Sequence, residues 1–305
     1  MRQGYPYRWL ALTGMLTISC LMHAQQEWIS TQYLFNLYDV NTAYAGNHHA
    51  LSTGIRHRAQ WEGVDGAPQS QLVSMHAPAL NGRIGWGMRL QRESIGARSQ
   101  WMGRASLAYR IPLRDGSFSF ALGGGVIRQE MDPASITAQD WNDPQLNGAD
   151  WTSTSVTWDA ACFIHGSRWF AGFEVNRINR GPMAWSSVSD ARLFLHGNVI
   201  GGRYFKLNED NLLACTAIAR VAEPGIIQAE ANLTCLWKNK VWLGAGYRYP
   251  SGPLAIAEVN ISRQLRLGYS YDLNSGALRD RQDGSHEVFI GYNLKPRDDK
   301  SIRQF

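Results

Sequence analysis

Apolar and polar residues alternate along most of the chain after about residue 50. From Leu265 to Leu273, every second residue is apolar or aromatic, and the positions between them include Arg266, Ser270 and Asp272. Side chains on a strand point alternately to opposite faces, so one face of this segment suits hydrocarbon and the other suits water. Repeated amphipathic strands of roughly ten residues are typical of an outer-membrane β-barrel. The pattern therefore predicts an all-β, antiparallel transmembrane barrel.

About fourteen such segments lie between turn residues. The predicted strands are 50–60, 69–77, 82–92, 99–111, 116–129, 154–165, 167–177, 191–206, 211–221, 225–237, 240–249, 253–262, 264–273 and 285–294. A single-chain bacterial barrel needs an even number of strands. The count fits that requirement.

The lengths of the connections support the same fold. Even-numbered connections are short and fall at 78–81, 112–115, 166, 207–210, 238–239 and 263. Several odd-numbered connections are long and fall at 61–68, 130–153, 179–190 and 274–284, although those near Glu223 and Ser251 are short. Barrels with short periplasmic turns and longer external loops alternate short and long connections in this way. A soluble β-sandwich has no reason to follow it.

The alternation assigns side chains to the two faces of the wall. The set expected to face lipid is Trp101, Leu107, Tyr109, Trp169, Phe173, Val175, Val241, Leu243, Tyr247, Tyr249, Val288, Ile290 and Tyr292. The set expected to face the lumen is Arg104, Arg110, Glu174, Glu230, Arg248, Glu258, Arg266 and Asp272. Such charges either line a permeation path or pair across the lumen. Pairing is the favoured interpretation, because an isolated buried charge is costly.

The N-terminus has the organisation of a secretory signal. Arg2 and Arg8 precede an apolar stretch of about fourteen residues, too short to span a bilayer comfortably, and Ala24 ends a small-residue cleavage site. A lipoprotein signal ending at Cys20 is the alternative, but it lacks the expected leucine. We therefore expect a signal peptide at 1–24, a leader at 25–49, the barrel at 50–294 and a periplasmic tail at 295–305.

Composition and charge narrow the function classes. The 12 tryptophans and 12 tyrosines suit interfacial girdles. The 30 basic residues include two in the signal, so the mature chain keeps 28 against 25 acidic ones, a net charge of +3. No basic cluster lies beside aromatic residues, which disfavours nucleic-acid binding. Cys162, Cys215 and Cys235 all fall on the apolar face; a disulfide between Cys215 and Cys235 is disfavoured but stays open.

No segment predicts an enzyme, a cofactor or a metal site. The adjacent His48 and His49 are expected to be solvated, and the segment 140–143 breaks the spacing of a calcium loop. The glycines at 123–125 lack the lysine and helix of a phosphate-binding loop. A hydrolase built from lumen Asp, His and Ser residues is a disfavoured alternative.

Three segments are more specific than the barrel pattern. The first is QYLFN at 32–36 with NTAYAG at 41–46, the second is QWEGVDGAP at 60–68 with SMHAP at 74–78, and the third is GSHEV at 284–288. Their candidate partner-binding residues are Phe35, Asn36, Asn41, Ala43, Tyr44 and Gly46; Trp61, Gly63, Gly66, Pro68, His76 and Pro78; and Ser285, His286 and Glu287.

In this order and relative to the signal, these segments resemble the PorP/SprF family of Bacteroidetes outer-membrane proteins. The resemblance covers residues 25 to 294, with Thr42 replacing a usual proline. It implies a non-catalytic accessory of type IX secretion and gliding motility in a Gram-negative outer membrane. The implied partners are secretion components, cargo with a C-terminal sorting domain, and membrane lipid or lipopolysaccharide.

Two questions stay open from the sequence. The aromatic leader, with Tyr33, Phe35, Tyr38 and Tyr44, is expected to dock at the periplasmic mouth or to enter the lumen. The long connection at 130–153, with Trp141 and Trp151, is expected to contact partners or the membrane surface. A porin or small-solute transporter is the rival function, because a barrel of this size can enclose an open lumen.

Overall fold

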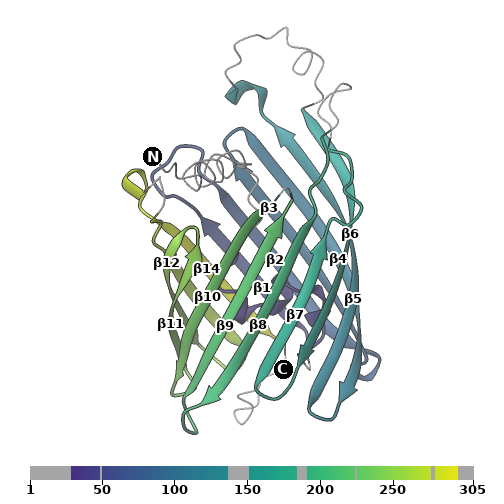
Figure 1. Ribbon diagram of the computed structural model, residues 1–305, viewed down its shortest axis with the longest axis vertical. Helices are drawn as coiled ribbons and strands as arrows, with labels where there is room; N and C mark the ends of the chain where they lie inside the picture. Colours follow the sequence, from purple (N-terminus) through teal and green to yellow (C-terminus); the bar gives the residue numbers. More distant parts are fainter. Residues whose placement is uncertain are drawn as a thin grey trace, which may run out of the picture.

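The alternating segments form antiparallel strands that close into one barrel (Figure 1). The computed structural model describes residues 29–48, 50–136, 151–183, 191–223, 225–275 and 279–294. Its strands are β1 (Ser52–Ala59), β2 (Gln69–Ala79), β3 (Ile84–Ile95), β4 (Arg98–Leu113), β5 (Gly116–Met131), β6 (Thr152–His165), β7 (Trp169–Asn176), β8 (His196–Lys206), β9 (Leu212–Ala222), β10 (Ile226–Trp237), β11 (Val241–Tyr249), β12 (Gly252–Asn260), β13 (Leu265–Asp272) and β14 (Ser285–Asn293). β1 pairs with both β2 and β14, so the sheet has no open edge at its ends.

The two faces of the wall differ as the alternation predicts. On β5, Leu122 is 71% exposed on the outside, whereas Ala121 beside it is 3% exposed towards the lumen. Every residue predicted to face lipid lies on the outer face, and every charge predicted to face the lumen lies on the inner face. The three cysteines described are unbonded; Cys215 pairs in register with Leu233 and not with Cys235.

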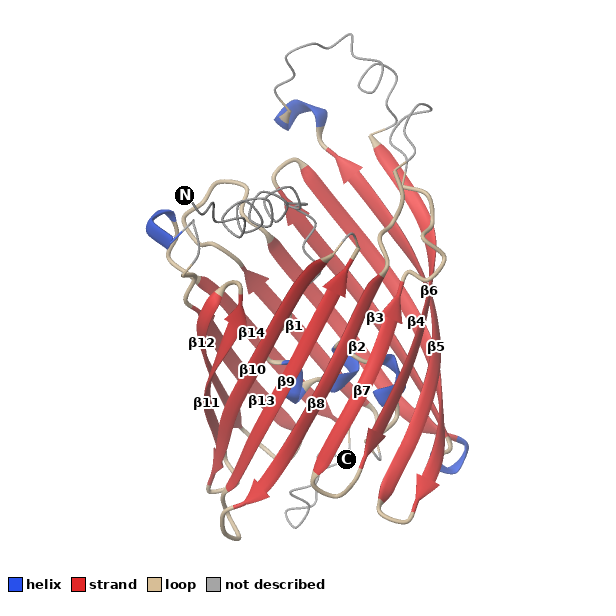
Figure 2. Cartoon of the chain, viewed as in Figure 1, coloured by secondary structure: helices blue, strands red, loops and turns tan. Residues whose placement is uncertain are grey.

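The two ends of the barrel have different connections (Figure 2). Long segments leave the barrel after β1, β5, β7 and β13, whereas short turns join β2 to β3, β4 to β5 and the later even-numbered pairs. We take the end with long loops as external and the other as periplasmic. β4, β5 and β6 are the longest strands, with 16, 16 and 14 residues, so one side of the wall rises above the external end.

The helical elements among the described residues are single 3₁₀ turns: η1 (Tyr33–Phe35), η2 (Leu37–Asp39), η3 (Thr42–Tyr44), η4 (Leu80–Gly82), η5 (Pro133–Ser135) and η6 (Arg279–Arg281). None of them is long and apolar enough to cross a membrane. η1 to η3 lie inside the barrel (Figure 2), and their buried side chains form the main core cluster with inward-facing wall residues.

Most strand boundaries agree with the predicted ones to within two residues, and two differ more. β3 extends to Ile95 because Ser94 and Ile95 continue the ladder with β4. β8 begins at His196 instead of residue 191. The residues before it turn inward, where Leu193 donates a backbone hydrogen bond of 2.9 Å to Gly181.

The described parts of the β7–β8 connection fold over the external end of the lumen. Met183 and Leu193 pack with Met102 and Ile127 of the tall wall in a second apolar cluster. At the rim, Arg180 forms an ion pair with Glu223, and its guanidinium lowers the pKa of that exposed carboxyl. This connection therefore narrows the lumen opening from above.

Candidate functional site

The leader passes through the lumen as a plug, defined here as residues 29–48. Its aromatic side chains are buried and reach different parts of the wall. The Tyr33 hydroxyl lies 3.0 Å from Thr216 Oγ1 on β9, and the Tyr38 hydroxyl lies 2.9 Å from Ser106 Oγ on β4. Tyr33 and Tyr38 are both fully buried. The plug therefore contacts opposite sides of the barrel at once.

Phe35 and Asn36 of the first motif fix the middle of the plug. The ring of Phe35 meets that of Trp242 on β11 edge to face, with centroids 5.8 Å apart. Asn36 donates a 2.9 Å hydrogen bond from Nδ2 to Ser74 on β2. One aromatic and one polar contact thus join this motif to two further strands.

Asn41 shapes the last turn of the plug and ties it to the wall. Its Oδ1 accepts a 3.0 Å hydrogen bond from the backbone amide of Ala43, which caps η3. Its Nδ2 donates to the carbonyl of Cys162 on β6 at 3.1 Å. Thr42 is buried within this turn.

The second half of the first motif meets the second motif at the periplasmic end. The Tyr44 ring packs edge to face against His76, with centroids 5.6 Å apart. The Gly46 amide donates to His76 Nδ1 at 3.1 Å. Gly46 has φ +72°, and a Cβ on it would lie 2.7 Å from Gly85 and 3.1 Å from Pro78. Only glycine fits this crossing without a backbone shift.

Small wall residues make room for the plug. A Cβ on Gly85 would lie 1.9 Å from the Ala45 carbonyl oxygen, and a Cβ on Gly87 would lie 2.4 Å from the Tyr38 ring. Both glycines occupy inward positions of β3. Their absent side chains allow the backbone and the tyrosine to lie against the wall.

Wall arginines from several strands also bind backbone carbonyl oxygens of the plug. Arg266 donates to Phe35 at 3.0 Å and Arg89 to Asp39 at 2.6 Å. Arg110 donates to the Ala45 carbonyl at 3.2 Å, and Arg220 donates to the Ser30 carbonyl at 3.4 Å. These bonds use plug acceptors that its short 3₁₀ turns leave open.

Thr31 lies at the centre of a buried charge network in the external half of the lumen. Its hydroxyl is 2.7 Å from Arg248 and 2.9 Å from Arg58, and both arginines form ion pairs with Asp272. Its backbone amide donates to Glu287 at 3.1 Å. The ion pairing predicted for lumen charges is therefore present, and the plug is part of it.

The second motif forms the first external loop, between β1 and β2. Trp61, Gly63 and Gly66 have φ values of 51°, 88° and 69°, so three of its residues are left-handed. The Gln60 amide donates to the carbonyl of Pro68 at 2.9 Å, which closes the loop at its base. These backbone conformations give the loop a fixed shape.

The third motif joins this loop to the plug through neighbouring residues of β14. Ser285 Oγ accepts a 3.2 Å hydrogen bond from the amide of Trp61. Two residues further, Glu287 accepts from the plug and from Arg58 at 3.3 Å. His286 points outward, with Nδ1 2.7 Å from the Tyr269 hydroxyl. Residues from all three motifs thus meet along the β14–β1–β2 part of the barrel.

The first external loop and the adjacent β3–β4 turn enclose a polar depression at the rim. Its volume is about 290 Å³, and its lining includes Trp61, Asp65 and Gly96. The Gly96 amide donates to the Gly66 carbonyl at 2.8 Å, and the Glu62 amide donates to Gly284 at 2.9 Å. We call this surface the rim site and define it as residues 60–69, 94–96 and 283–285.

The two candidate tryptophans of the long β5–β6 connection are not part of the rim site. Trp151 has φ 53°, and its carbonyl accepts a 2.8 Å hydrogen bond from Met131 at the top of the tall hairpin. Trp141 lies outside the described residues, as do the signal peptide, His49, the segment 140–143 and the C-terminal tail.

Several important residues were not singled out from the sequence. Five of them form hydrogen bonds between the plug and the wall within the lumen: Thr31, Asp39, Arg56, Arg58 and Arg89. The parity of β1 and β3 could have placed the three arginines inside, since Ile55 on β1 and Leu90 on β3 are apolar and lie in the opposite phase, facing outward. Within the described chain, no group of three or more His, Cys, Asp or Glu side chains is arranged to hold a metal ion.

Comparison with known families gives one match that spans most of the chain. The model of the family described as "Type IX secretion system membrane protein PorP/SprF" matches residues 22–292. No curated protein matches the sequence.

Solved structures share the fold at low sequence identity. The Ralstonia pickettii toluene transporter TbuX is 8% identical, with a TM-score of 0.51 over 88% of this chain and 94% of that one. The Acinetobacter baumannii outer-membrane protein Omp33 is 5% identical, with a TM-score of 0.45 over 81% of this chain and 99% of that one. The likeness to TbuX concerns the barrel fold alone.

Proposed function

Because the chain belongs to the PorP/SprF family of type IX secretion system membrane proteins, we propose that it is a plugged, non-catalytic outer-membrane partner that binds secreted surface proteins at its external rim. The protein is an outer-membrane β-barrel. The cargo has a C-terminal sorting domain and is held at the cell surface. Other partners are components of the same secretion system and the surrounding lipid and lipopolysaccharide.

The filled lumen is the observation that carries this proposal. The plug reaches β2 through Asn36, β4 through Tyr38, β9 through Tyr33 and β11 through Phe35. Its polar groups are bound by wall side chains on all these sides. A barrel that uses its own chain to fill its interior suits a binding or anchoring role better than solute passage.

The rim site is the surface best suited to the partner. It is concave and polar, and its backbone conformation is fixed by left-handed residues and by hydrogen bonds to two neighbouring segments. Preformed loops of this kind bind partners without a large ordering cost. Trp61 supplies a partly exposed aromatic side chain, a residue type that is enriched among the strongest contributors to interface energy.

The rival function is a porin or a transporter of small solutes. It requires a continuous water-filled path through the barrel. The described plug and the inward-folded β7–β8 connection both oppose such a path. The likeness to a toluene transporter does not favour the rival, because it concerns the barrel fold alone.

Affinity purification from native membranes with mass spectrometry tests the proposal. We expect the tagged protein to bring down type IX components and one or a few exported proteins that carry a C-terminal sorting domain. Recovery of the barrel without any exported protein would contradict the proposal, and steady ion conductance of the purified barrel in planar bilayers would support the rival.

A further inference from the structure

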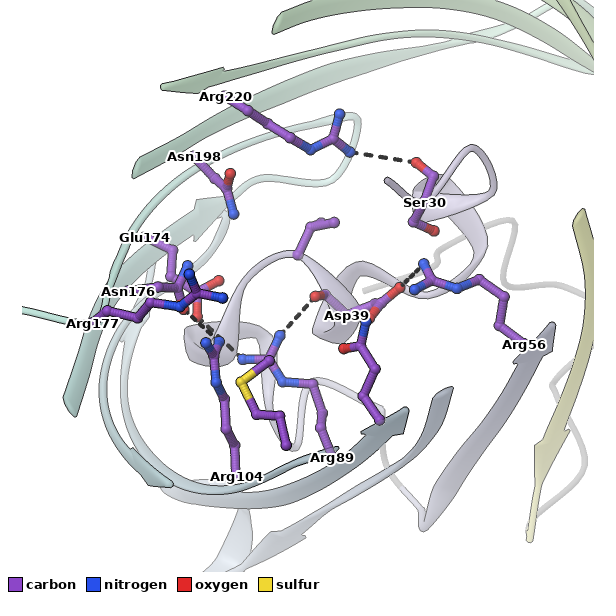
Figure 3. Close-up of a pocket in the computed structure, with 13 residues that line it drawn as sticks. Ser30, Asp39, Arg56, Arg89, Arg104, Glu174, Asn176, Arg177, Asn198 and Arg220 are labelled. Atoms are coloured by element: carbon purple, nitrogen blue, oxygen red, sulfur yellow. Dashed lines mark hydrogen bonds and ion pairs between the residues drawn. The ribbon is translucent and has the colours of Figure 1, made fainter. Parts of the chain in front are cut away.

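Arginines inside the barrel are matched by acceptors of the plug and the wall (Figure 3). Arg56 pairs with Asp39 at 2.6 Å, and Arg89 pairs with Glu174 at 3.2 Å. Buried charges are stable only with such partners. These side chains hold the plug in place, and the arginines of the outer face have a different environment.

Charged side chains are few on the outer face of the wall. Across the fourteen strands described, Arg92, Arg128 and Arg203 are the only Arg or Lys side chains that point outward, and Glu130 is the only outward carboxylate. Arg92 on β3 and Arg128 on β5 lie near the external end, whereas Arg203 lies near the periplasmic end of β8. Arginine is strongly disfavoured at the bilayer midplane, so these positions suit the two membrane interfaces.

Arg92 and Arg128 flank one tryptophan in a single row of the sheet. Trp101 of β4 pairs in register with Arg92 on one side and with Arg128 on the other. The Arg92 guanidinium lies 5.5 Å from the centre of the Trp101 ring, in a cation–π contact. Since adjacent strands are about 4.8 Å apart, the backbones of the two arginines are roughly 10 Å apart. We call these three residues the outer basic row.

The outer basic row lies at the upper limit of the apolar band. The next outward positions towards the periplasm are Leu90, Gly103 and Val126. Below them, every outward residue of β3, β4 and β5 is apolar, aromatic or glycine. The apolar band of an outer-membrane barrel is about 25 Å tall and is flanked by aromatic residues at both interfaces. The row is therefore at the level of the lipid head groups of the outer leaflet.

The positive charge of this row is available to an anion. Arg92 has no carboxylate partner among the described residues. Arg128 pairs with Glu130 at 2.7 Å, but the two side chains are 57% and 43% exposed. Exposed pairs contribute little to stability, because water and salt screen them. An anion can therefore bind Arg92 and share Arg128 with Glu130.

The other side of the barrel has a different external interface. The outward residues at the external ends of β9, β10 and β11 are Val221, Ile227 and Tyr249, which are exposed and uncharged. Arg203 also stacks on an aromatic ring, with its guanidinium 5.3 Å from the centre of Phe205, but it lies near the periplasmic end. On the strands described, outward arginines at the external interface are thus confined to β3 and β5.

We propose that the outer basic row binds the phosphate groups of an outer-leaflet lipopolysaccharide, whose acyl chains lie against the apolar band below. Arginine forms short charge-assisted hydrogen bonds to phosphate oxygens, and stacking on Trp101 orients the Arg92 guanidinium before the lipid binds. The bound lipid fixes the height of β3, β4 and β5 in the membrane. The proposal rests on the outer-membrane location and does not depend on cargo binding at the rim site.

Titration of the purified full-length barrel in detergent with lipid A, the phosphorylated membrane anchor of lipopolysaccharide, tests this site. Bisphosphorylated lipid A is compared with the same lipid after removal of its phosphates, and binding is measured by native mass spectrometry. A chelator is present, so that no divalent cation bridges a carboxylate and a phosphate. We expect the phosphorylated form to bind about tenfold or more tightly. Equal affinities would overturn the proposal, because the apolar band alone would then hold the lipid.

Substitutions in the row should change this affinity in opposite directions. The double variant Arg92→Gln and Arg128→Gln should weaken binding of bisphosphorylated lipid A about tenfold or more. Glu130→Gln should tighten it, because a carboxylate that competes with the phosphate for Arg128 is removed. Heat-modifiable migration on gels shows that each variant is folded. Unchanged binding in the double variant would overturn the proposal.

Arg203→Gln is the matched control, because it removes an outward arginine that also stacks on an aromatic ring, but at the periplasmic interface. It should leave lipid A binding unchanged, and weakening equal to that of the double variant would overturn the proposal. Phosphatidylglycerol in place of lipid A should bind more weakly; equal affinity would mean that the row takes any anionic lipid. Normal lipid A binding in the double variant, with reduced co-purification of exported proteins, would assign the row to a protein partner instead.

Discussion

The backbone amide of Gln32 donates a 2.9 Å hydrogen bond to the carboxylate of Glu287, joining residues 255 positions apart. Glu287 lies on the last strand, which also closes the barrel by pairing with β1. Its side chain is fully buried and also binds Arg58. The seating of the plug and the closure of the barrel therefore depend on the same strand.

Substitution of Glu287 should loosen the plug. Glu287→Leu leaves Arg58 with one fewer carboxylate and leaves two plug amides without their acceptor. Loss of one partner from a buried ion pair costs roughly 3–5 kcal/mol. We expect the gel band of the folded barrel to shift to the unfolded position at a lower temperature than in wild type. We also expect brief conducting events in planar bilayers.

Glu130→Leu is the control for that variant, because its ion pair with Arg128 is exposed at the external end. Exposed pairs contribute about 0–1 kcal/mol. If both variants behave like wild type, the network around Thr31 does not hold the plug.

The glycines that face the plug should not tolerate a side chain. Gly87→Ala places a Cβ within 2.4 Å of the Tyr38 ring, whereas Gly103→Ala on the neighbouring strand meets no atom within 4 Å. Hydrogen exchange should show faster exchange of amides at 33–44 in the first variant only. Equal protection in both variants would mean that Tyr38 does not lie against β3 as described.

The outward face should reject charge. Leu233 is 52% exposed on β10 between Cys215 and Ala245, well above the Trp237 end of its strand. Leu233→Arg should destabilise the folded barrel by roughly 2–4 kcal/mol in lipid, the cost of arginine near mid-bilayer. Ile261→Arg, in the β12–β13 turn, should cost much less. Urea titration in lipid vesicles measures the free energy of unfolding of both variants. A larger loss of stability for Ile261→Arg than for Leu233→Arg would contradict the assignment of Leu233 to the lipid-facing side.

The strands and their faces were predictable because the period of two is a local property of the sequence. Arg248 and Asp272 could be placed in the lumen by their phase on single strands. Their meeting at Thr31 could not, because it depends on how the barrel closes and on how far the plug enters. The 3₁₀ turns of the plug also carry no periodic signal.

The prediction that the eighth strand begins at residue 191 was wrong for a related reason. Residues 191–195 can be read as a continuation of the strand pattern, but Leu193 instead packs inward on Met102. That apolar contact lies across the lumen opening, where no local pattern indicates it. The candidate residues of the three motifs were identified by resemblance, and their partner-binding role stays a prediction.

A substitution in the rim site should weaken partner binding more than an equally strained substitution elsewhere in the barrel. Gly66 has φ +69°, and a Cβ on it would lie 3.1 Å from Gly96, whereas Gly82 has φ +79° in a periplasmic turn with nothing within 4 Å. Alanine at either position incurs similar left-handed strain of about 1 kcal/mol. Gly66→Ala should reduce co-purification of exported proteins, and Gly82→Ala should not. Equal recovery of partners with both variants would mean that the rim site does not bind the exported proteins.

The surface proteome of a clean deletion strain shows whether the protein holds exported proteins at the cell surface. We expect quantitative mass spectrometry of surface-exposed proteins to show loss of one or a few large proteins with C-terminal sorting domains, which plasmid-borne wild type restores. Growth on small solutes should be unaffected. A surface proteome identical to that of the parent, together with slowed uptake of a small solute, would contradict a role in cargo binding and support the transporter function.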